Sequence, residues 1–231
     1  MTGVARVPTP RVSMPRIKVC CICSIHEAAV AVAHGASALG LVSHMPSGPG
    51  VVADADIAAI IATVPPPIAT FLLTSAVTAD AIIAQQQRMR PTTLQLVDQL
   101  TSDVHRELRS ALPGITLVQV VHVENDDSVA YAIAIAPVVD ALLLDSGRLS
   151  APVKELGGTG RTHDWSLSRR IRDECGKPVF LAGGLHAGNV AAAIRTVEPF
   201  GLDLCTGVRT NGALDPAKLA AFMGAAAAIR L

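Results

Sequence analysis

Residues 178–208 read PVFLAGGLHAGNVAAAIRTVEPFGLDLCTGV, and this stretch decides the fold class. It begins and ends with short apolar runs, 178–182 and 202–206, and an amphipathic, alanine-rich segment at 187–197 lies between them. Short apolar runs indicate strands that are buried on both faces, and an intervening helix brings the chain back so that the two strands lie parallel. The stretch therefore predicts a strand–helix–strand unit with a glycine-containing turn after each strand.

The same alternation continues outward along the whole chain. Apolar runs predict strands at 17–23, 38–43, 68–73, 93–97, 115–121, 139–145, 178–182 and 202–206. Amphipathic stretches predict helices at 26–34, 54–63, 78–88, 102–111, 126–136, 165–174, 187–197 and 215–229. Eight strands in strict alternation with helices predict an α/β single domain, a (β/α)₈ TIM barrel. An open doubly wound sheet is the alternative, but no G-x-G-x-x-G motif follows the first strand to support its dinucleotide-binding form.

Two helix starts carry capping signals. Ser24 is followed three residues later by Glu27, which is the spacing of a capping box. Asp215 precedes Pro216, so the helix there is predicted to begin with an aspartate cap and a proline in its first position.

The composition excludes several classes of protein. Nineteen basic and 19 acidic residues give a net charge of zero, so no electrostatic attraction to nucleic acid or an anionic membrane is expected. No apolar run reaches the roughly 18 residues of a membrane span. Residues 1–16 contain prolines and arginines without a secretory apolar core, and we interpret them as a flexible extension before a barrel at 17–231. The expected location is the cytoplasm.

The cysteines predict neither a disulfide framework nor a metal site. There are five, namely Cys20, Cys21, Cys23, Cys175 and Cys205. The odd count argues against full pairing, and adjacent cysteines on a strand point to opposite faces. No second ligand cluster follows at a zinc-like spacing, so we expect no metal and no cofactor.

The last two predicted strands both end in glycine. The strand at 178–182 is followed by Gly183 and Gly184, and the strand at 202–206 by Gly207 and Val208. Glycine lets backbone N–H groups approach an anion closely, and the loops after strands seven and eight commonly bind phosphate in such barrels. An ordinary tight turn explains either pair alone, whereas both together predict a phosphate site.

Two further strand ends carry reactive side chains. Asp145 follows Ala-Leu-Leu-Leu at the predicted barrel mouth, where a partly desolvated carboxyl can act as a general acid; a loop-capping role is the alternative. The loop at 147–163 that follows contains four closely spaced small residues at 157–160, which is typical of a binding loop. Cys20 on the first strand could act as a base, although from the residues alone a buried inert thiol is the better explanation.

Five segments together resemble the phosphoribosylanthranilate isomerase family. They are KVCCICS (18–24), LLLDS (142–146), GGTGRTHDW (157–165), LAGGLHAGNV (181–190) and LDLCTGVR (202–209). The family is a cofactor-independent (β/α)₈ barrel that performs an Amadori rearrangement of an aminoaldose phosphate to an aminoketose phosphate in tryptophan biosynthesis.

The resemblance implies a role for individual residues. Cys20 falls on the general base of the family and Asp145 on its general acid. Gly183, Gly184, Gly207 and Val208 fall on backbone positions that hold the substrate phosphate. Asp203 matches a position near the substrate, and Gly158 lies in the glycine-rich loop segment of the family.

The chain departs from the family at the end that binds the aglycone, the amine joined to the sugar. The usual Cys-Gly-Ile-Thr is Cys-Cys-Ile-Cys at 20–23, and the arginine that grips the anthranilate carboxylate aligns with Gly50. A bidentate arginine–carboxylate contact is strong and specific, so its loss predicts an altered aglycone site. His44 beside this loop and Arg209, which replaces a glutamate, are predicted to contact the substrate; Arg148 and Arg161 are other candidate cations.

These observations predict an aldose–ketose isomerase whose ligand is a small phosphorylated sugar, with no nucleic-acid or membrane partner, as a monomer or a homodimer. Two alternatives stay open: an aldolase, epimerase or lyase on the same phosphate-binding barrel, and a non-catalytic paralogue. The extra thiols at Cys21 and Cys23 further suggest a site that is sensitive to oxidation.

Overall fold

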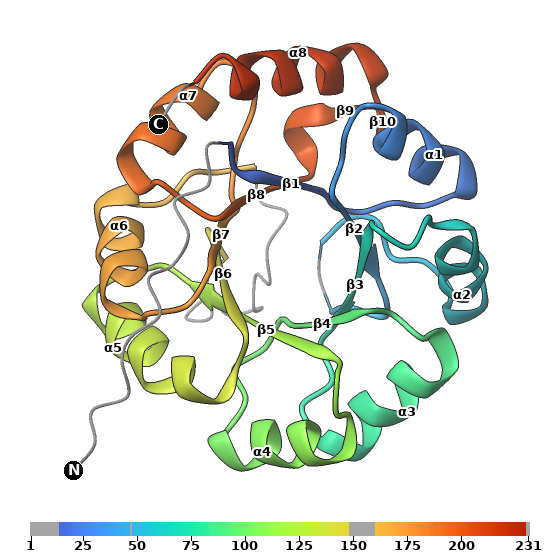
Figure 1. The fold of residues 1–231 in the computed structure, drawn as a ribbon, viewed down its shortest axis with the longest axis vertical. Coiled ribbons are helices and arrows are strands. Elements are labelled where there is room, and N and C mark those ends of the chain that lie inside the picture. The colour runs from blue at the N-terminus through green and yellow to red at the C-terminus, as the bar shows by residue number, and fades with distance from the viewer. Residues whose placement is uncertain (1–13, 47, 148–159, 230–231) are drawn as a thin grey trace.

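The strands close into a parallel barrel, as Figure 1 shows for the computed structural model, which describes residues 14–46, 48–147 and 160–229. Each strand pairs with the next along the chain, and the last pairs with the first. The strands are β1 (Arg16–Val19), β2 (Ala38–Val42), β3 (Ala69–Thr74), β4 (Thr93–Leu96), β5 (Thr116–His122), β6 (Ala141–Asp145), β7 (Val179–Leu181) and β8 (Gly201–Leu204). The barrel confirms the predicted fold class.

The helices surround the barrel and cover its outer face (Figure 1). They are α1 (Ile25–Ala33), α2 (Asp54–Thr63), α3 (Ala79–Met89), α4 (Ser102–Ala111), α5 (Asp126–Ile135), α6 (Trp165–Glu174), α7 (Val190–Val197) and α8 (Pro216–Ala227). The side chains of both predicted N-cap residues, Ser24 and Asp215, cap their helices. Ser24 accepts from the Glu27 amide at 3.1 Å, and Asp215 accepts from the amides of Ala217 and Lys218.

Alternating side chains along each strand divide the core into two layers. On β8, Leu202 and Leu204 point outward and are fully buried in the layer between strands and helices. Asp203, between them, faces the barrel interior, where Phe71 and Phe180 pack edge to face. Inward-facing residues at the carboxyl ends of the strands therefore meet in one place.

The boundaries differ from the predicted ones where the backbone turns. The first strand, predicted at 17–23, ends at Val19 because Cys21 adopts a left-handed conformation with φ 61°. The seventh helix, predicted from 187, begins at Val190 after a turn. After β8 come a short 3₁₀ helix η2 (Thr206–Val208) and a hairpin of β9 (Arg209–Thr210) and β10 (Ala213–Leu214), which apolar periodicity does not reveal.

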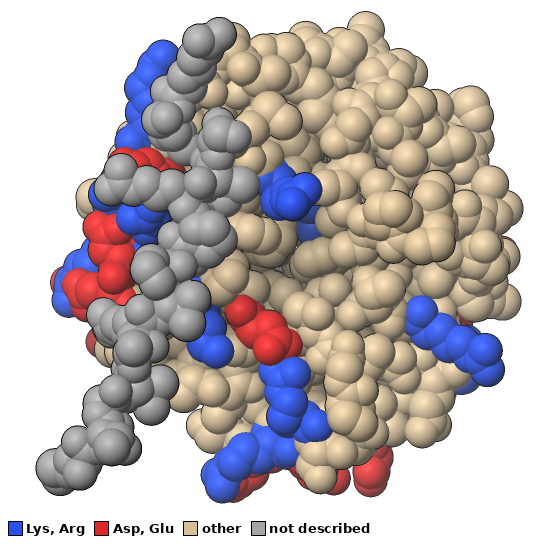
Figure 2. Space-filling model, viewed as in Figure 1, with Lys and Arg blue, Asp and Glu red and all other residues tan. Residues whose placement is uncertain are grey.

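Charged side chains on the face shown in Figure 2 gather mainly near the helices α4 to α6, with both signs together. Arg170 of α6 pairs with Asp126 at 2.6 Å and with Glu174 at 3.0 Å, and Arg172 pairs with Glu198 at 3.2 Å. These pairs neutralise one another locally. Among the described residues, no helix is long and apolar enough to cross a membrane.

Candidate active site

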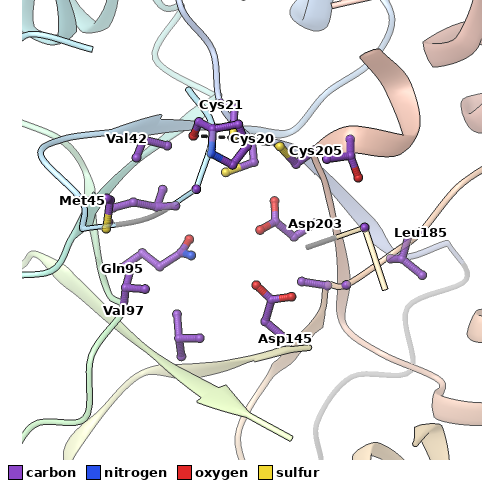
Figure 3. A pocket seen from close by; sticks show the side chains of 18 of the residues that line it. Cys20, Cys21, Val42, Met45, Gln95, Val97, Asp145, Leu185, Asp203 and Cys205 are labelled. Carbon is purple, nitrogen blue, oxygen red and sulfur yellow. Dashed lines mark hydrogen bonds between the residues drawn. The ribbon is translucent and has the colours of Figure 1, made fainter. Parts of the chain in front are cut away.

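The carboxyl ends of the strands surround a pocket that contains most of the predicted site residues (Figure 3). Cys20, Asp145 and Asp203 line it, from β1, β6 and β8 respectively. The glycine turn after β7 forms another part of the wall through Gly183 and Gly184. The topology thus brings together residues that are more than 100 positions apart in the sequence.

Cys20 is a buried thiol at the first residue after β1. Its amide donates to the carbonyl of Leu204 at 2.7 Å, which keeps the residue in register with β8. Its sulfur lies where a Cβ on Gly40 would come within 2.8 Å, so the glycine leaves it room. The adjacent Cys21 thiol lowers the pKa of Cys20 from its ordinary value; burial opposes this shift and the charge of Lys18 supports it. The thiolate is therefore the favoured form relative to a free cysteine.

Lys18 supplies that charge from inside the barrel. It is fully buried, and its Nζ donates to Asp203 Oδ1 at 2.8 Å. Burial alone would lower the pKa of Lys18, but the Asp203 carboxylate outweighs it and raises the pKa above the usual value. The lysine is therefore a fixed cation behind the pocket.

Asp145 ends β6 and points into the pocket beside Asp203 (Figure 3). Its Oδ1 accepts from the Ser146 amide at 2.7 Å, which orients the carboxyl group. Nearby, burial lowers the pKa of His163 to about 4, although the charge of Asp145 acts in the opposite direction. His163 is therefore neutral at physiological pH.

The turn after β7 requires glycine on two grounds. Gly183 and Gly184 have φ values of 82° and 61°, and a Cβ on either would come within 3.1 Å of the Arg161 carbonyl oxygen. Among the described residues, neither Gly183 nor Gly184 donates its amide to a backbone carbonyl. Adjacent amides in a glycine turn at the pocket wall form a suitable nest for an anion.

The turn after β8 is packed against the turn after β7. A Cβ on Gly207 would lie 2.0 Å from the Leu185 carbonyl, so only glycine allows this approach. Thr206 lines the pocket, whereas Val208 is fully buried in the outer core layer. Any phosphate contact from 207–208 would therefore come from the backbone.

Two other predicted contacts, Arg209 and His44, lie outside the pocket lining. Arg209 does not line the pocket; its guanidinium is buried against Glu27 and donates to the backbone carbonyls of Cys20 and Cys21. His44 is exposed at the surface and also lies outside the pocket lining. Gly158 lies outside the described residues.

Comparison with known proteins identifies the family. A family model described as N-(5'phosphoribosyl)anthranilate (PRA) isomerase matches residues 17–225. The chain belongs to this family. A relative named N-(5'-phosphoribosyl)anthranilate isomerase from Haloferax volcanii is 36% identical over 94% of this chain and 95% of its own. The chain is thus an aldose–ketose isomerase of a family that works without a cofactor.

Solved structures of phosphoribosylanthranilate isomerases agree with the barrel. The enzyme from Thermotoga maritima superposes with a TM-score of 0.81 at 26% identity, covering 94% of this chain and all of the other. A second isomerase structure, a complex with reduced 1-(o-carboxyphenylamino)-1-deoxyribulose 5-phosphate, has a TM-score of 0.78 at 25% identity, with 94% of this chain and all of the other covered. The reaction of the family is an Amadori rearrangement.

The structure adds one polar residue that sequence reasoning did not assign to the isomerase site. Gln95 on β4 is 3% exposed and lines the pocket, and its Oε1 has no hydrogen-bond partner among the described residues. An unpaired buried acceptor is unfavourable unless a ligand donates to it.

Proposed function

We propose that this isomerase rearranges an N-(5-phosphoribosyl) amine to a 1-amino-1-deoxyribulose 5-phosphate, with Asp145 as general acid and Cys20 as general base. The observation that carries the proposal is that both side chains line one pocket, next to the glycine turn after β7. Two-group acid–base catalysis needs a proton donor and an acceptor in one site, with environments that separate their pKa values.

The steps conserve atoms and electrons within the substrate. Asp145 donates a proton to the furanose ring oxygen while the amine nitrogen pushes its lone pair toward C1; the ring C–O bond breaks and an iminium ion forms. The Cys20 thiolate then removes the C2 proton, and its electrons neutralise the iminium to give an enolamine. Tautomerisation gives the ketone, so C2 is oxidised and C1 reduced with no external reagent.

The remaining groups would bind and orient the substrate. The Gly183 and Gly184 amides would hold the phosphate, supported by the backbone at Gly207 and Val208. Asp203, held by Lys18, faces the sugar, and the unpaired Gln95 oxygen can accept from a substrate hydroxyl or N–H. Lys18 is a protonated ammonium group in this arrangement, which disfavours the Schiff-base aldolase alternative.

The test is turnover of synthetic adducts of ribose 5-phosphate with aromatic amines. Cys20→Ser and Asp145→Asn should each reduce kcat by at least about 100-fold, since each removes one proton-transfer group. Phosphate-analogue binding measured by calorimetry should stay within about threefold in both variants. Full activity in either variant, or no turnover of any adduct by the wild-type protein, would contradict the proposal.

We extend the proposal to a cytoplasmic enzyme acting on a free small-molecule substrate. The composition supports this, since net charge is zero and no helix of the described residues could span a membrane. The expectation of a monomer or homodimer is tested by light scattering.

A further inference from the structure

We infer that Gln95 is a further catalytic residue of this site: its side-chain oxygen accepts a hydrogen bond from the N–H of the substrate amine and stabilises the iminium ion. The inference rests on the proposed function and assigns the contact that this side chain makes in that reaction. It depends on the burial of Gln95, on the lack of a partner for its oxygen among the described residues, and on its position across the pocket from the glycine turn after β7.

Gln95 is a polar side chain set among apolar neighbours. It points into the barrel from β4, and its partners in register on β3 and β5 are Leu73 and Val118, both of them buried. Gln95 is itself 3% exposed and lines the pocket. A carboxamide buried in such surroundings is unfavourable unless its polar atoms are hydrogen-bonded. A partner for this side chain is therefore expected.

The described part of the protein does not supply that partner. The Oε1 atom of Gln95 is buried and accepts no hydrogen bond, and among the described residues none is recorded for its Nε2. Gln119 on β5 shows the contrast, because its Nε2 donates to three backbone carbonyls and its Oε1 lies 2.9 Å from His105 Nε2. The carboxamide of Gln119 is thus fixed in the core, whereas that of Gln95 can turn its oxygen toward a ligand.

The position of Gln95 selects the amine N–H as the donor. Its side chain points across the pocket toward Asp145 and Asp203, from the side opposite Leu185, which directly follows the glycine turn after β7 (Figure 3). A substrate whose phosphate binds at that turn extends from C5 to C1 across the pocket. Its amine nitrogen is then the hydrogen-bond donor furthest from the phosphate, and it lies on the side of Gln95.

This contact grows stronger as the reaction proceeds. In the bound aminoaldose the N–H group is a neutral donor. Once the ring C–O bond breaks, the nitrogen carries the positive charge of the iminium ion, and its hydrogen bond to Gln95 Oε1 becomes charge-assisted. An interaction that is stronger in the transition state than in the ground state raises kcat. A neutral carboxamide also accepts this bond without taking the proton, so the charge stays on the nitrogen until Cys20 removes the C2 proton.

Substrate pairs that differ only in the N–H group test the inference. They are the adducts of ribose 5-phosphate with anthranilate and N-methylanthranilate, and with aniline and N-methylaniline. Each N-methyl adduct can form an iminium ion but has no N–H to donate, and in the aniline pair no ortho carboxylate competes for the N–H. Gln95→Met keeps the length of the side chain and removes the acceptor. We expect it to lower kcat for the N–H adducts by about 10- to 100-fold, with KM within about threefold, and to change kcat for the N-methyl adducts by less than about threefold.

Gln95→Glu is the matched control, because it keeps an oxygen acceptor at the same position. It should retain the wild-type preference for N–H over N-methyl adducts within about threefold, and this ratio cancels any general effect of the added carboxyl group. If the N-methyl adducts are not turned over by any variant, the N–H adducts decide: kcat lost in Gln95→Met must be largely recovered in Gln95→Glu. If Gln95→Met does not fold by circular dichroism, Gln95→Leu takes its place, since leucine also lacks an acceptor.

The outcomes separate this inference from the proposed function. Unchanged kcat for the N–H adducts in Gln95→Met, or an equal fall for both members of a pair, would overturn the role of Gln95 and leave the proposed function intact. Equal losses in Gln95→Met and Gln95→Glu would do the same. No turnover of these or other aromatic-amine adducts by the wild-type protein would overturn both.

Discussion

At the scale of single residues, the reactivity of the Cys20 thiol is set by its neighbour. The adjacent Cys21 thiol lowers the pKa of Cys20, whereas Cys20 and Cys205 raise the pKa of Cys21, so Cys21 stays protonated. Replacing Cys21 by alanine should therefore raise the pKa of Cys20. Because the base acts as a thiolate, the acid limb of the pH profile of kcat/KM should move to higher pH. Cys21→Ser keeps a hydrogen-bond donor and should shift the acid limb less. Cys23→Ser is the control and should leave the acid limb where it is.

The same thiol forms a contact that predicts sensitivity to oxidation. The sulfurs of Cys21 and Cys205 are 2.9 Å apart, about 0.9 Å longer than a disulfide bond. Peroxide would oxidise one thiol to a sulfenic acid, and the other sulfur would displace water from it to form the disulfide. Activity should fall, since the Cys21 thiol no longer lowers the pKa of Cys20, and dithiothreitol should restore it. Mass spectrometry would show the loss of two hydrogens. Unchanged activity after peroxide would contradict this prediction, and so would an equal loss of activity in the Cys205→Ser variant.

At the scale of elements, the turn between β1 and α1 is fixed from the other end of the chain. Arg209 of β9 donates through Nη1 and Nη2 to both Glu27 oxygens at 3.1 and 3.2 Å, and Nη2 also donates to the Cys20 carbonyl at 3.2 Å. Glu27 accepts in addition from the amides of Cys23 at 3.0 Å and Leu214 at 2.8 Å. This network holds Cys21 in its left-handed conformation, which costs a residue other than glycine on the order of 1 kcal/mol.

Arg209→Gln should therefore misplace the base without emptying the pocket. We expect kcat to fall by about 10- to 100-fold with KM within about threefold, because a small displacement of a catalytic group is costly while the phosphate contacts persist. Adding Cys21→Gly should recover part of kcat when kcat is measured at a pH where Cys20 is fully ionised, since glycine adopts the left-handed turn without strain and the lost Cys21 thiol then has no effect on the charge of the base. If KM rose by as much as kcat fell, and the double variant recovered neither, Arg209 would act only on overall folding.

The elements also show which features could be predicted from the sequence. The barrel follows from local periodicity, because each buried strand and each amphipathic helix carries its own pattern over a few residues. The placement of Cys20 and Asp145 in one pocket follows from the rule that parallel strands end at one edge. The Arg209–Glu27 pair spans 182 positions, and the packing of Gly50 on Cys21 depends on one turn conformation, so neither has a local signal.

At the scale of the whole molecule, the barrel is closed where its two ends meet. β1 pairs with β8 from Arg16 with Gly201 to Val19 with Leu204, and the Lys18–Asp203 ion pair crosses the same junction inside the barrel. Lys18 Nζ also lies 5.3 Å from the centre of the Phe71 ring. The cation of the first strand therefore contacts side chains of the third and last strands, and it contributes to barrel closure as well as to the pKa of Cys20.

Removing one partner of this pair should destabilise the whole domain. Lys18→Met leaves the Asp203 carboxylate buried without a counter-charge, and we expect the free energy of unfolding to fall by about 3–5 kcal/mol. Adding Asp203→Asn removes that charge, so the double variant should regain most of the loss. Urea unfolding followed by circular dichroism measures both changes. The comparison requires the same m-value, the slope of unfolding free energy against urea concentration, in every variant. A single variant within about 1 kcal/mol of the wild type would mean that Asp203 is neutral or solvated in the folded barrel, because only an ionised, buried carboxylate requires the lysine.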